Sequence, residues 1–504
     1  ILVPKKSKEC VQPMKKKTRV TLISDGWTSV ANRPIVNVLM LVCGIAMLLQ
    51  AVDTSGFDKT AFFIADLVTK HIVEIGEVYV AAVCMDGACK SAMKIIKKRY
   101  PHIQVFSCPS HAIDLFLKNV GSDQPTINMQ SNQLSGVETQ HVEWGITFFS
   151  DTFDNVWFVV KFVTNHHKPL ARYRALVKAL PIGHALRQQG NELLKYGETR
   201  FASKVMMARR MLSCRELYEA LLTDNDYKAW LEKQSSEVKE TAQEVKDIIN
   251  DRHFWATLDV VVRTLNVAVT TLRISNGMSG GVLGKLFDLC LQLDTLYAVP
   301  IEGLDDDVRE KVHQIWCARW KSFHVPVMSA AYMLHPEFCR RDWSQMPEQR
   351  LDLTKVMKEM ATEQHTYAKI RTQYTAFRNA CEEQSHDLND NQAFSAASLS
   401  VPPHHWIETW MEPWPDLMWF ALRVVCIPCS ASAAEHSWSI EGWIHSKHRN
   451  RLGQKLVERL VRAHMNMAVD RALDEAIKKL LPWDIELVID EPMGPPEDTV
   501  EILD

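Results

Sequence analysis

The sequence predicts a mixed α/β domain followed by a long helical region. Over residues 19–120, apolar runs of strand length alternate with amphipathic segments, a pattern typical of α/β folds. From residue 146 to about residue 380, apolar residues recur instead at helical spacing. The chain has 504 residues, of which 46% are hydrophobic and 24% charged, so we expect an ordinary globular protein of two or three domains.

The α/β region is expected to contain three strands, then a helix, and then a strand–helix–strand–helix sequence. This order by itself supports a mixed α/β domain. The expected strands are Val20–Ser24, Ile35–Cys43, Ala46–Val52, Val78–Met85 and Ile103–Phe106, and the expected helices are Lys59–Ile75, Ala88–Arg99 and His111–Val120.

The stretch between Arg33 and Asp53 carries no charge and is long enough to span a bilayer. Pro34 and other turn-forming or polar residues interrupt it, and Cys43-Gly44 divides it into two runs of strand length. We therefore expect a buried β-hairpin here and no membrane partner.

The net charge of −3 argues against a surface that attracts nucleic acid everywhere, so any DNA binding must use local basic patches. The twelve cysteines lack dense regular spacing, which favours reduced thiols in an intracellular protein. The lysine-rich start of the chain has no apolar segment of the kind found in a secretory signal.

Three carboxylates stand in settings that suit metal binding. Asp25 and Asp86 follow apolar runs, and Glu435 lies on an expected helix. Such a set is what a two-metal phosphoryl-transfer site requires. The aspartates are also plausible turn residues, and Glu435 is also a plausible first-turn acid favoured by the helix dipole. Glu441, two turns further on, is the other acid that could be taken for the third carboxylate.

The residues around these carboxylates resemble the hAT superfamily of DNA transposases, which includes many transposase-derived host proteins. The similar segments follow the family's order and cover about residues 19–470. They are T-L-I-S-D-G-W-T-S (21–29), V-C-M-D-G-A-C-K-S-A (83–92), Y-P-H-I-Q-V-F-S-C-P-S-H-A-I-D-L-F-L-K (100–118), G-E-T-R-F-A-S (197–203), A-A-Y-M-L-H-P (330–336) and the block from Pro415 through W-S-I-E-G-W-I-H-S-K-H-R-N-R-L (438–452).

The resemblance implies an α/β ribonuclease-H-like core that is interrupted by a large all-α insertion domain and completed by C-terminal helices. In that fold the first and fourth strands are neighbours, which would bring Asp25 and Asp86 together. The expected parts are a basic tail (1–18), the first part of the core (19–200, with a loop at 121–140), the helical insertion domain (201–414), the C-terminal core helices and dimerisation region (415–480), and an acidic tail (481–504).

The resemblance also implies a DDE-type transposase, in which Asp25, Asp86 and Glu435 hold Mg²⁺ or Mn²⁺ for DNA strand cleavage and transfer, without an organic cofactor. The alternative is a domesticated, non-catalytic protein that dimerises and binds DNA or chromatin. Either protein would be nuclear and would self-associate through its C-terminal region. The expected DNA-binding residues are His111, Arg200, Phe201, Lys447, Arg449 and Arg451.

Several of these residues keep a second interpretation. Cys108 and His111 form a C-x-x-H pair that, with Cys84 and Cys89, would give a zinc ligand set, although we favour His111 facing a DNA phosphate. Phe201 either stacks on an unstacked base or packs in the core.

The C-terminal third holds two further features with more than one interpretation. The C-x-x-C pair 426–429 is expected to be two buried small residues rather than a redox centre. The tryptophans that are frequent there are expected to form a core or a subunit contact.

Overall fold

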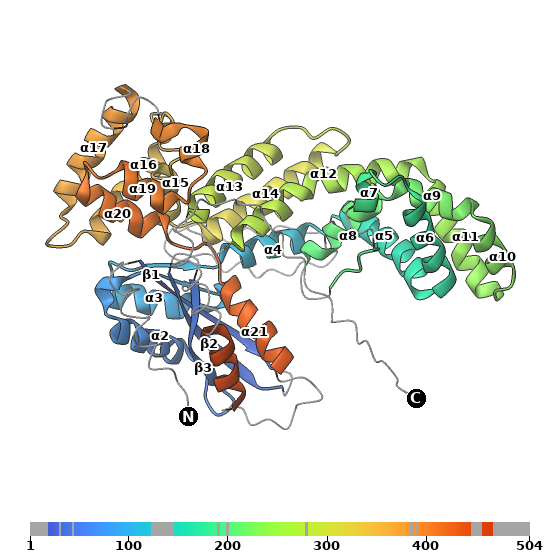
Figure 1. Ribbon diagram of the computed structural model, residues 1–504, viewed down its shortest axis with the longest axis horizontal. Coiled ribbons are helices and arrows are strands. Elements are labelled where there is room, and N and C mark those ends of the chain that lie inside the picture. The colour runs from blue at the N-terminus through green and yellow to red at the C-terminus, as the bar shows by residue number, and fades with distance from the viewer. Residues whose placement is uncertain are drawn as a thin grey trace.

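The computed structural model describes residues 19–29, 32–42, 45–121, 146–188, 192–197, 201–277, 281–383, 388, 392–444 and 456–466. Within these residues a mixed sheet near the N-terminus is joined to a much larger helical part, as Figure 1 shows. The expected α/β domain with a large helical part is therefore confirmed.

The sheet has five strands in the order β3-β2-β1-β4-β5. β1, β2 and β3 pair antiparallel, whereas β4 pairs parallel to β1 and β5 pairs parallel to β4. The uncharged stretch forms the β2–β3 hairpin, as expected, and no helix in the described part of the chain is long and apolar enough to cross a membrane. The strands are β1 (Val20–Thr28), β2 (Pro34–Val42), β3 (Ile45–Asp53), β4 (Val80–Met85) and β5 (Gln104–Ser107).

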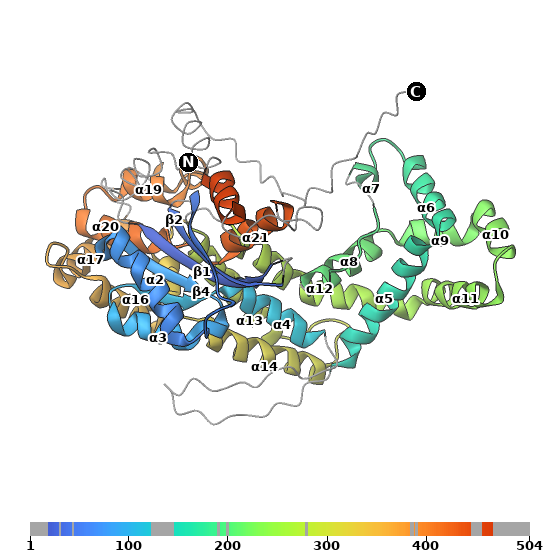
Figure 2. The same cartoon turned by 90° about the horizontal axis from the view of Figure 1, so that it is seen from below.

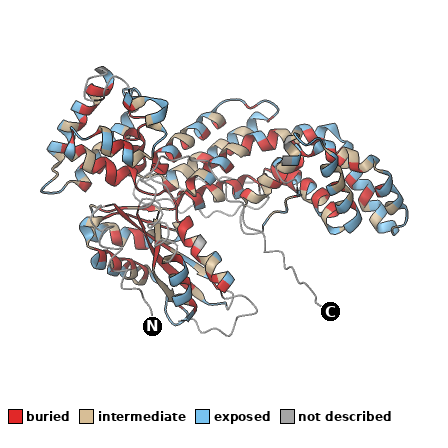
Figure 3. Ribbon diagram, viewed as in Figure 1, coloured by how far each residue is buried: buried red, intermediate tan, exposed pale blue. Residues whose placement is uncertain are grey.

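Helices cover both faces of the sheet. Successive strand residues point to opposite faces, so Leu22 packs into one core with α2 (Ala61–Ile75) and α3 (Lys90–Arg99), while Ile23 packs into the other core with α4 (Pro109–Val120). α21 (Ser432–Ile444) lies against β1 and β2 on the opposite side from α2 (Figure 2). β2 and β4 are accordingly almost wholly buried (Figure 3).

The helical part extends away from the sheet as an arm (Figure 1). α5 and α6 pack against the helices from α8 to α12, so the helical part begins at residue 147, within the segment 19–200 that we expected to belong to the core. The arm contains α5 (Thr147–Asn165), α6 (His167–Ala179), α7 (Ala185–Gln188), α8 (Ala202–Ser213), α9 (Arg215–Thr223), α10 (Asn225–Glu232), α11 (Ser236–Asn250) and α12 (Arg252–Ser275).

The remaining helices bring the chain back from the arm to the sheet. α14 packs on α4, and α20 lies against α13, α15, α17 and α19. These helices are α13 (Val282–Ala298), α14 (Asp306–Phe323), α15 (Pro326–Met333), α16 (Pro347–Met360), α17 (Tyr367–Glu383), α18 (Ala396–Leu399), α19 (Pro403–Trp410) and α20 (Pro415–Val425), and short 3₁₀ turns occur at η1 (Glu77–Tyr79), η2 (Gly87–Cys89) and η4 (Gln392–Phe394).

Arg423 of α20 ties this returning segment to the sheet. Its guanidinium donates to the carbonyl oxygens of Val78 at 2.8 Å and Val80 at 3.0 Å, where β4 begins. The side chain is 3% exposed, and burial lowers its pKa to about 10. Because the bond to Val80 is fully buried, the guanidinium satisfies a carbonyl that would otherwise be costly to bury.

We expect Arg423→Met to lower the free energy of unfolding by on the order of 2–4 kcal/mol, because two carbonyl oxygens lose their donor. Urea unfolding followed by circular dichroism measures this loss. Arg371→Met removes an exposed arginine that stacks on Tyr374 of α17, and it should cost little. Equal losses in the two variants would contradict a specific role for Arg423.

Candidate active site

The parallel pairing of β1 with β4 brings Asp25 and Asp86 together. This pairing ends at Ser24 opposite Met85. Asp25 is the residue after Ser24, and Asp86 is the residue after Met85. We expected Asp25 to follow the first strand, but it lies within β1. The reason is that β2 continues to pair with β1 beyond the last pair of β1 with β4. Asp25 itself lies opposite Asn37 of β2.

Asp86 is held by the turn that follows β4. It caps the N-terminus of η2, and its Oδ1 accepts from the backbone N–H of Ala88 at 3.3 Å. The same oxygen lies 3.6 Å from Nε2 of His111, which is half exposed on the first turn of α4. The turn interpretation of Asp86 is thus correct, and the turn fixes the direction of the carboxylate.

The segment that leads into α21 is fixed by buried hydrogen bonds. The backbone N–H of Ala431 donates to Sγ of Cys108 at 3.3 Å, which links this segment to the start of α4. The hydroxyl of Ser432 and the thiol of Cys429 donate to the carbonyl oxygens of Asn276 and Ser275 at the end of α12. α21 therefore begins at a position set by two other helices.

Two contacts between α21 and the sheet then hold this helix in place. Nδ2 of Asn37 donates to Oγ of Ser437 at 2.8 Å, and both side chains are fully buried. The rings of Trp27 and Trp438 stack with centroids 6.0 Å apart and planes inclined by 11°. Glu435 lies in the first turn of this helix, as expected, on the approach to the edge where Asp25 and Asp86 lie.

Electrostatic interactions show that the three carboxylates share one region. Burial, together with the nearby Asp86, Cys108 and Glu435, raises the pKa of Asp25 to about 8, against the lowering effect of a hydrogen bond from the backbone N–H of Gly26 at 2.7 Å. Glu435 therefore lies close enough to Asp25 for its charge to act on that carboxyl, and Glu441, the other acid considered on α21, is 2% exposed.

The ligand atoms of the three carboxylates are not all within 4.8 Å of one another. Within the described ranges, the one group of three His, Cys, Asp or Glu side chains whose ligand atoms all lie within 4.8 Å is elsewhere, on α13 and α14. Carboxylate oxygens are the ligands that Mg²⁺ prefers. A buried carboxyl beside two like charges stays protonated near neutral pH unless a cation offsets them, so this donor set fits divalent ions.

The cysteines near this site do not form the zinc set considered above. Cys84 and Cys108 are buried and hydrogen-bonded to each other, an interaction that raises the pKa of the Cys84 thiol. In the part of the chain that the structure describes, they do not gather with Cys89 and His111 around one point. Cys426 and Cys429 are buried before α21, as expected for small core residues.

A basic group beside η2 was not apparent from the sequence. Burial lowers the pKa of Lys90, and the nearby charges of Arg319 and Lys94 lower it further, so the three cations lie near one another. Arg319 comes from α14, and burial lowers its pKa to about 10. In the sequence, only the run of basic residues on α3 pointed to this group. The contribution of Arg319 could not be predicted, because it comes from a helix that is distant in the sequence.

Two of the six expected DNA-binding residues are described. His111 lies beside Asp86, and Phe201 is half buried, with its ring edge-on to Phe153 at 5.6 Å and Nζ of Lys204 5.2 Å from the ring centroid. Phe201 packs against the edge of the hydrophobic core and is partly exposed to solvent. Arg200, Lys447, Arg449 and Arg451 lie outside the described residues.

Two models of protein families match the chain. Residues 382–467 match the hAT family C-terminal dimerisation region, which includes Glu435. Residues 3–139 match a domain of unknown function (DUF659), which is found in hAT-like transposases and here includes Asp25 and Asp86. A search of curated proteins gave no match.

We expect the stability of Asp25→Asn relative to the wild type to depend on pH. Because the folded-state pKa of Asp25 lies near 8, above its ordinary value of 3.8, the wild type loses stability as the pH rises between these values. The asparagine does not titrate. The variant should therefore be the more stable protein at pH 8, by on the order of 1–3 kcal/mol in the presence of EDTA, and the two should converge toward pH 4.

Urea unfolding over this pH range measures the difference. Asp66→Asn is the matched control, because Asp66 is an exposed acid on α2 that pairs with Arg99. A stability difference for Asp25→Asn that stayed constant from pH 4 to pH 8 would show that the Asp25 carboxyl is not buried as described.

Proposed function

Because the chain is a member of the hAT superfamily of transposases and transposase-derived proteins, we propose that it cleaves and transfers DNA strands with Asp25, Asp86 and Glu435. The observation that supports this proposal is that the charges of Asp86 and Glu435 both act on the Asp25 carboxyl, although the three residues come from three distant segments. The sheet would be a ribonuclease-H-like core. Its neighbouring first and fourth strands agree with that fold.

Asp25, Asp86 and Glu435 would hold Mg²⁺ or Mn²⁺, which when bound activates a water or a 3′-hydroxyl and stabilises the leaving oxygen. The chain's own part is to fix the three carboxylates. Asp25 is held by its pairing with β2, one residue beyond the last pair of β1 with β4, and Asp86 is held by its cap to η2. Asp25 must lose its proton to act as a ligand, so ion binding should strengthen as the pH approaches 8.

DNA would be held by local cationic groups, since the whole chain carries a net charge of −3. Lys90, Lys94 and Arg319 gather beside the turn that follows Asp86, where they can contact phosphates without reading the base sequence. His111, Arg200, Phe201, Lys447, Arg449 and Arg451 complete the proposed contacts, and a protein with this activity would act in the nucleus.

The first test is nicking of supercoiled plasmid DNA with Mg²⁺ or Mn²⁺. We expect Asp25→Asn, Asp86→Asn and Glu435→Gln each to lower the nicking rate by about 100-fold or more, because each removes a proposed ligand. Asp66→Asn should keep the wild-type rate. DNA affinity is measured in parallel by fluorescence anisotropy. A wild-type chain that binds DNA but never nicks it, with all variants binding equally, would mean a domesticated, non-catalytic protein.

The matched dimerisation region supports self-association of this chain. Within it, α21 and the helix at 456–466 carry exposed apolar side chains: Trp443 is 66% exposed, Leu456 47% and Leu460 40%. Leu456, Leu460 and His464 are four residues apart and so share one helix face, and the His464 ring lies 6.3 Å from that of Trp443. We propose that this stripe contacts its own copy in an isologous dimer.

We expect Trp443→Glu combined with Leu460→Glu to weaken the dimer by at least about tenfold, because a charge would then be buried at the centre of an apolar contact. Sedimentation velocity over a micromolar concentration range measures the change. Leu351→Glu is the control, since Leu351 is 70% exposed on α16, outside the matched region. A double variant that dimerises like the wild type would move the interface away from this stripe.

A further inference from the structure

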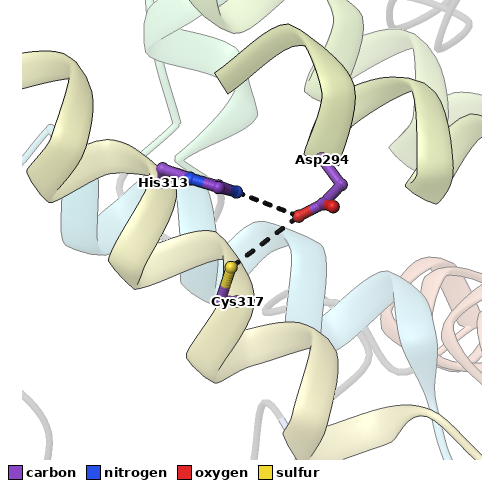
Figure 4. Close-up of side chains that lie close together, drawn as sticks. All are labelled: Asp294, His313 and Cys317. Carbon is purple, nitrogen blue, oxygen red and sulfur yellow. Dashed lines mark hydrogen bonds and ion pairs between the residues drawn. The ribbon is translucent and has the colours of Figure 1, made fainter. Parts of the chain in front are cut away.

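Three side chains with different metal-binding groups meet between α13 and α14, outside the proposed active site. Asp294 comes from α13, while His313 and Cys317 are four residues apart on α14 and therefore share one face of it (Figure 4). Nε2 of His313 lies 3.1 Å and Sγ of Cys317 lies 3.7 Å from the same oxygen, Oδ1 of Asp294. All three ligand atoms lie within 4.8 Å of one another.

This spacing is close to that of a tetrahedral zinc site. Zinc binds imidazole nitrogen, thiolate and carboxylate oxygen at about 2.0–2.3 Å, which places neighbouring ligand atoms about 3.3–3.7 Å apart. Of the two distances to Oδ1, 3.7 Å lies at the upper end of that range and 3.1 Å lies just below it. An ion can therefore enter with small side-chain movements and without a change in the packing of the two helices.

The simpler interpretation is a set of hydrogen bonds between two helices. It places two donors, His313 and Cys317, on a single carboxylate oxygen, whereas a cation would use all three groups as ligands. The charges of Glu310 and Lys321, which lie on α14 before His313 and after Cys317, act on Cys317 with opposite signs. Asp294 is 53% exposed, which leaves an approach from solvent.

We propose that Asp294, His313 and Cys317 bind a zinc ion, with water as the fourth ligand, and that this ion fastens α13 to α14. On binding, Cys317 gives up its thiol proton to solvent, and His313 binds through Nε2 while its ring hydrogen stays on Nδ1. α14 also packs on α4, where Trp316 meets Phe116 with ring centroids 5.4 Å apart. The ion would thus stabilise the layer of helices on which α4 rests.

The test is a titration of the metal-free full-length protein with Co²⁺, which replaces zinc and gives a thiolate-to-metal absorption band when a cysteine is a ligand. We expect one equivalent of Co²⁺ to produce this band and Zn²⁺ to remove it. Cys317→Ser should abolish the band, and His313→Asn or Asp294→Asn should weaken Co²⁺ binding at least about tenfold.

Cys89→Ser is the matched control, because Cys89 and Cys317 are the partly exposed cysteines in the described part of the chain. It should keep the band, as should the combined variant Asp25→Asn, Asp86→Asn and Glu435→Gln, so a loss of DNA nicking and a loss of this site are separate results. Zn²⁺ should also raise the melting temperature of the wild type but not that of Cys317→Ser. The proposal is overturned if the wild type gives no band, or if the band survives in Cys317→Ser.

Discussion

The seating of α21 on the sheet is the contact on which the proposed site depends. Asn37 of β2 and Ser437 of α21 are 400 residues apart, and their buried side chains form a hydrogen bond. A buried amide left without its partner costs about 1–3 kcal/mol, and the stacked pair of Trp27 and Trp438 adds about 0.5–1.5 kcal/mol beyond its buried area. These contacts fix the position of α21, and strand pairing fixes the position of Asp25, so the charge of Glu435 reaches Asp25 because of structure that lies outside the site.

The helical part has a structural role in this arrangement. The end of α12 accepts hydrogen bonds from Cys429 and Ser432, which lie just before α21, so the long excursion of the chain through the arm ends where the final helix must begin. Arg423 adds a second tie, from α20 to the start of β4. The helical part thus supports the sheet and α21, because buried polar groups join them at several points. Arg319 of α14 adds a positive charge beside Lys90.

Burial of the Asp25 carboxyl links stability to chemistry. A carboxyl whose neutral form is favoured by burial and by two nearby negative charges makes the folded protein less stable at neutral pH than an uncharged residue would. A bound cation reverses that effect, since it favours the ionised form. Asp25 therefore lowers the stability of the protein without a cation and would raise it when a cation is bound. Such a residue is common where function rather than stability determines which side chain is kept.

The sequence by itself determined the strands and helices of the α/β region, because hydrophobic periodicity and turn residues are local signals. The hairpin between Arg33 and Asp53 and the positions of Asp86 and Glu435 on their elements followed from the same signals and from the family resemblance. Tertiary structure alone decided the rest. It placed Asp25 within β1, where β2 continues to pair, and it set the packing of α5 and α6 with the helices from α8 to α12, the grouping of Arg319 with Lys90, and the meeting of Asp294 with His313 and Cys317. These depend on which helix faces pack together, and packing between distant segments leaves no periodic trace in the chain.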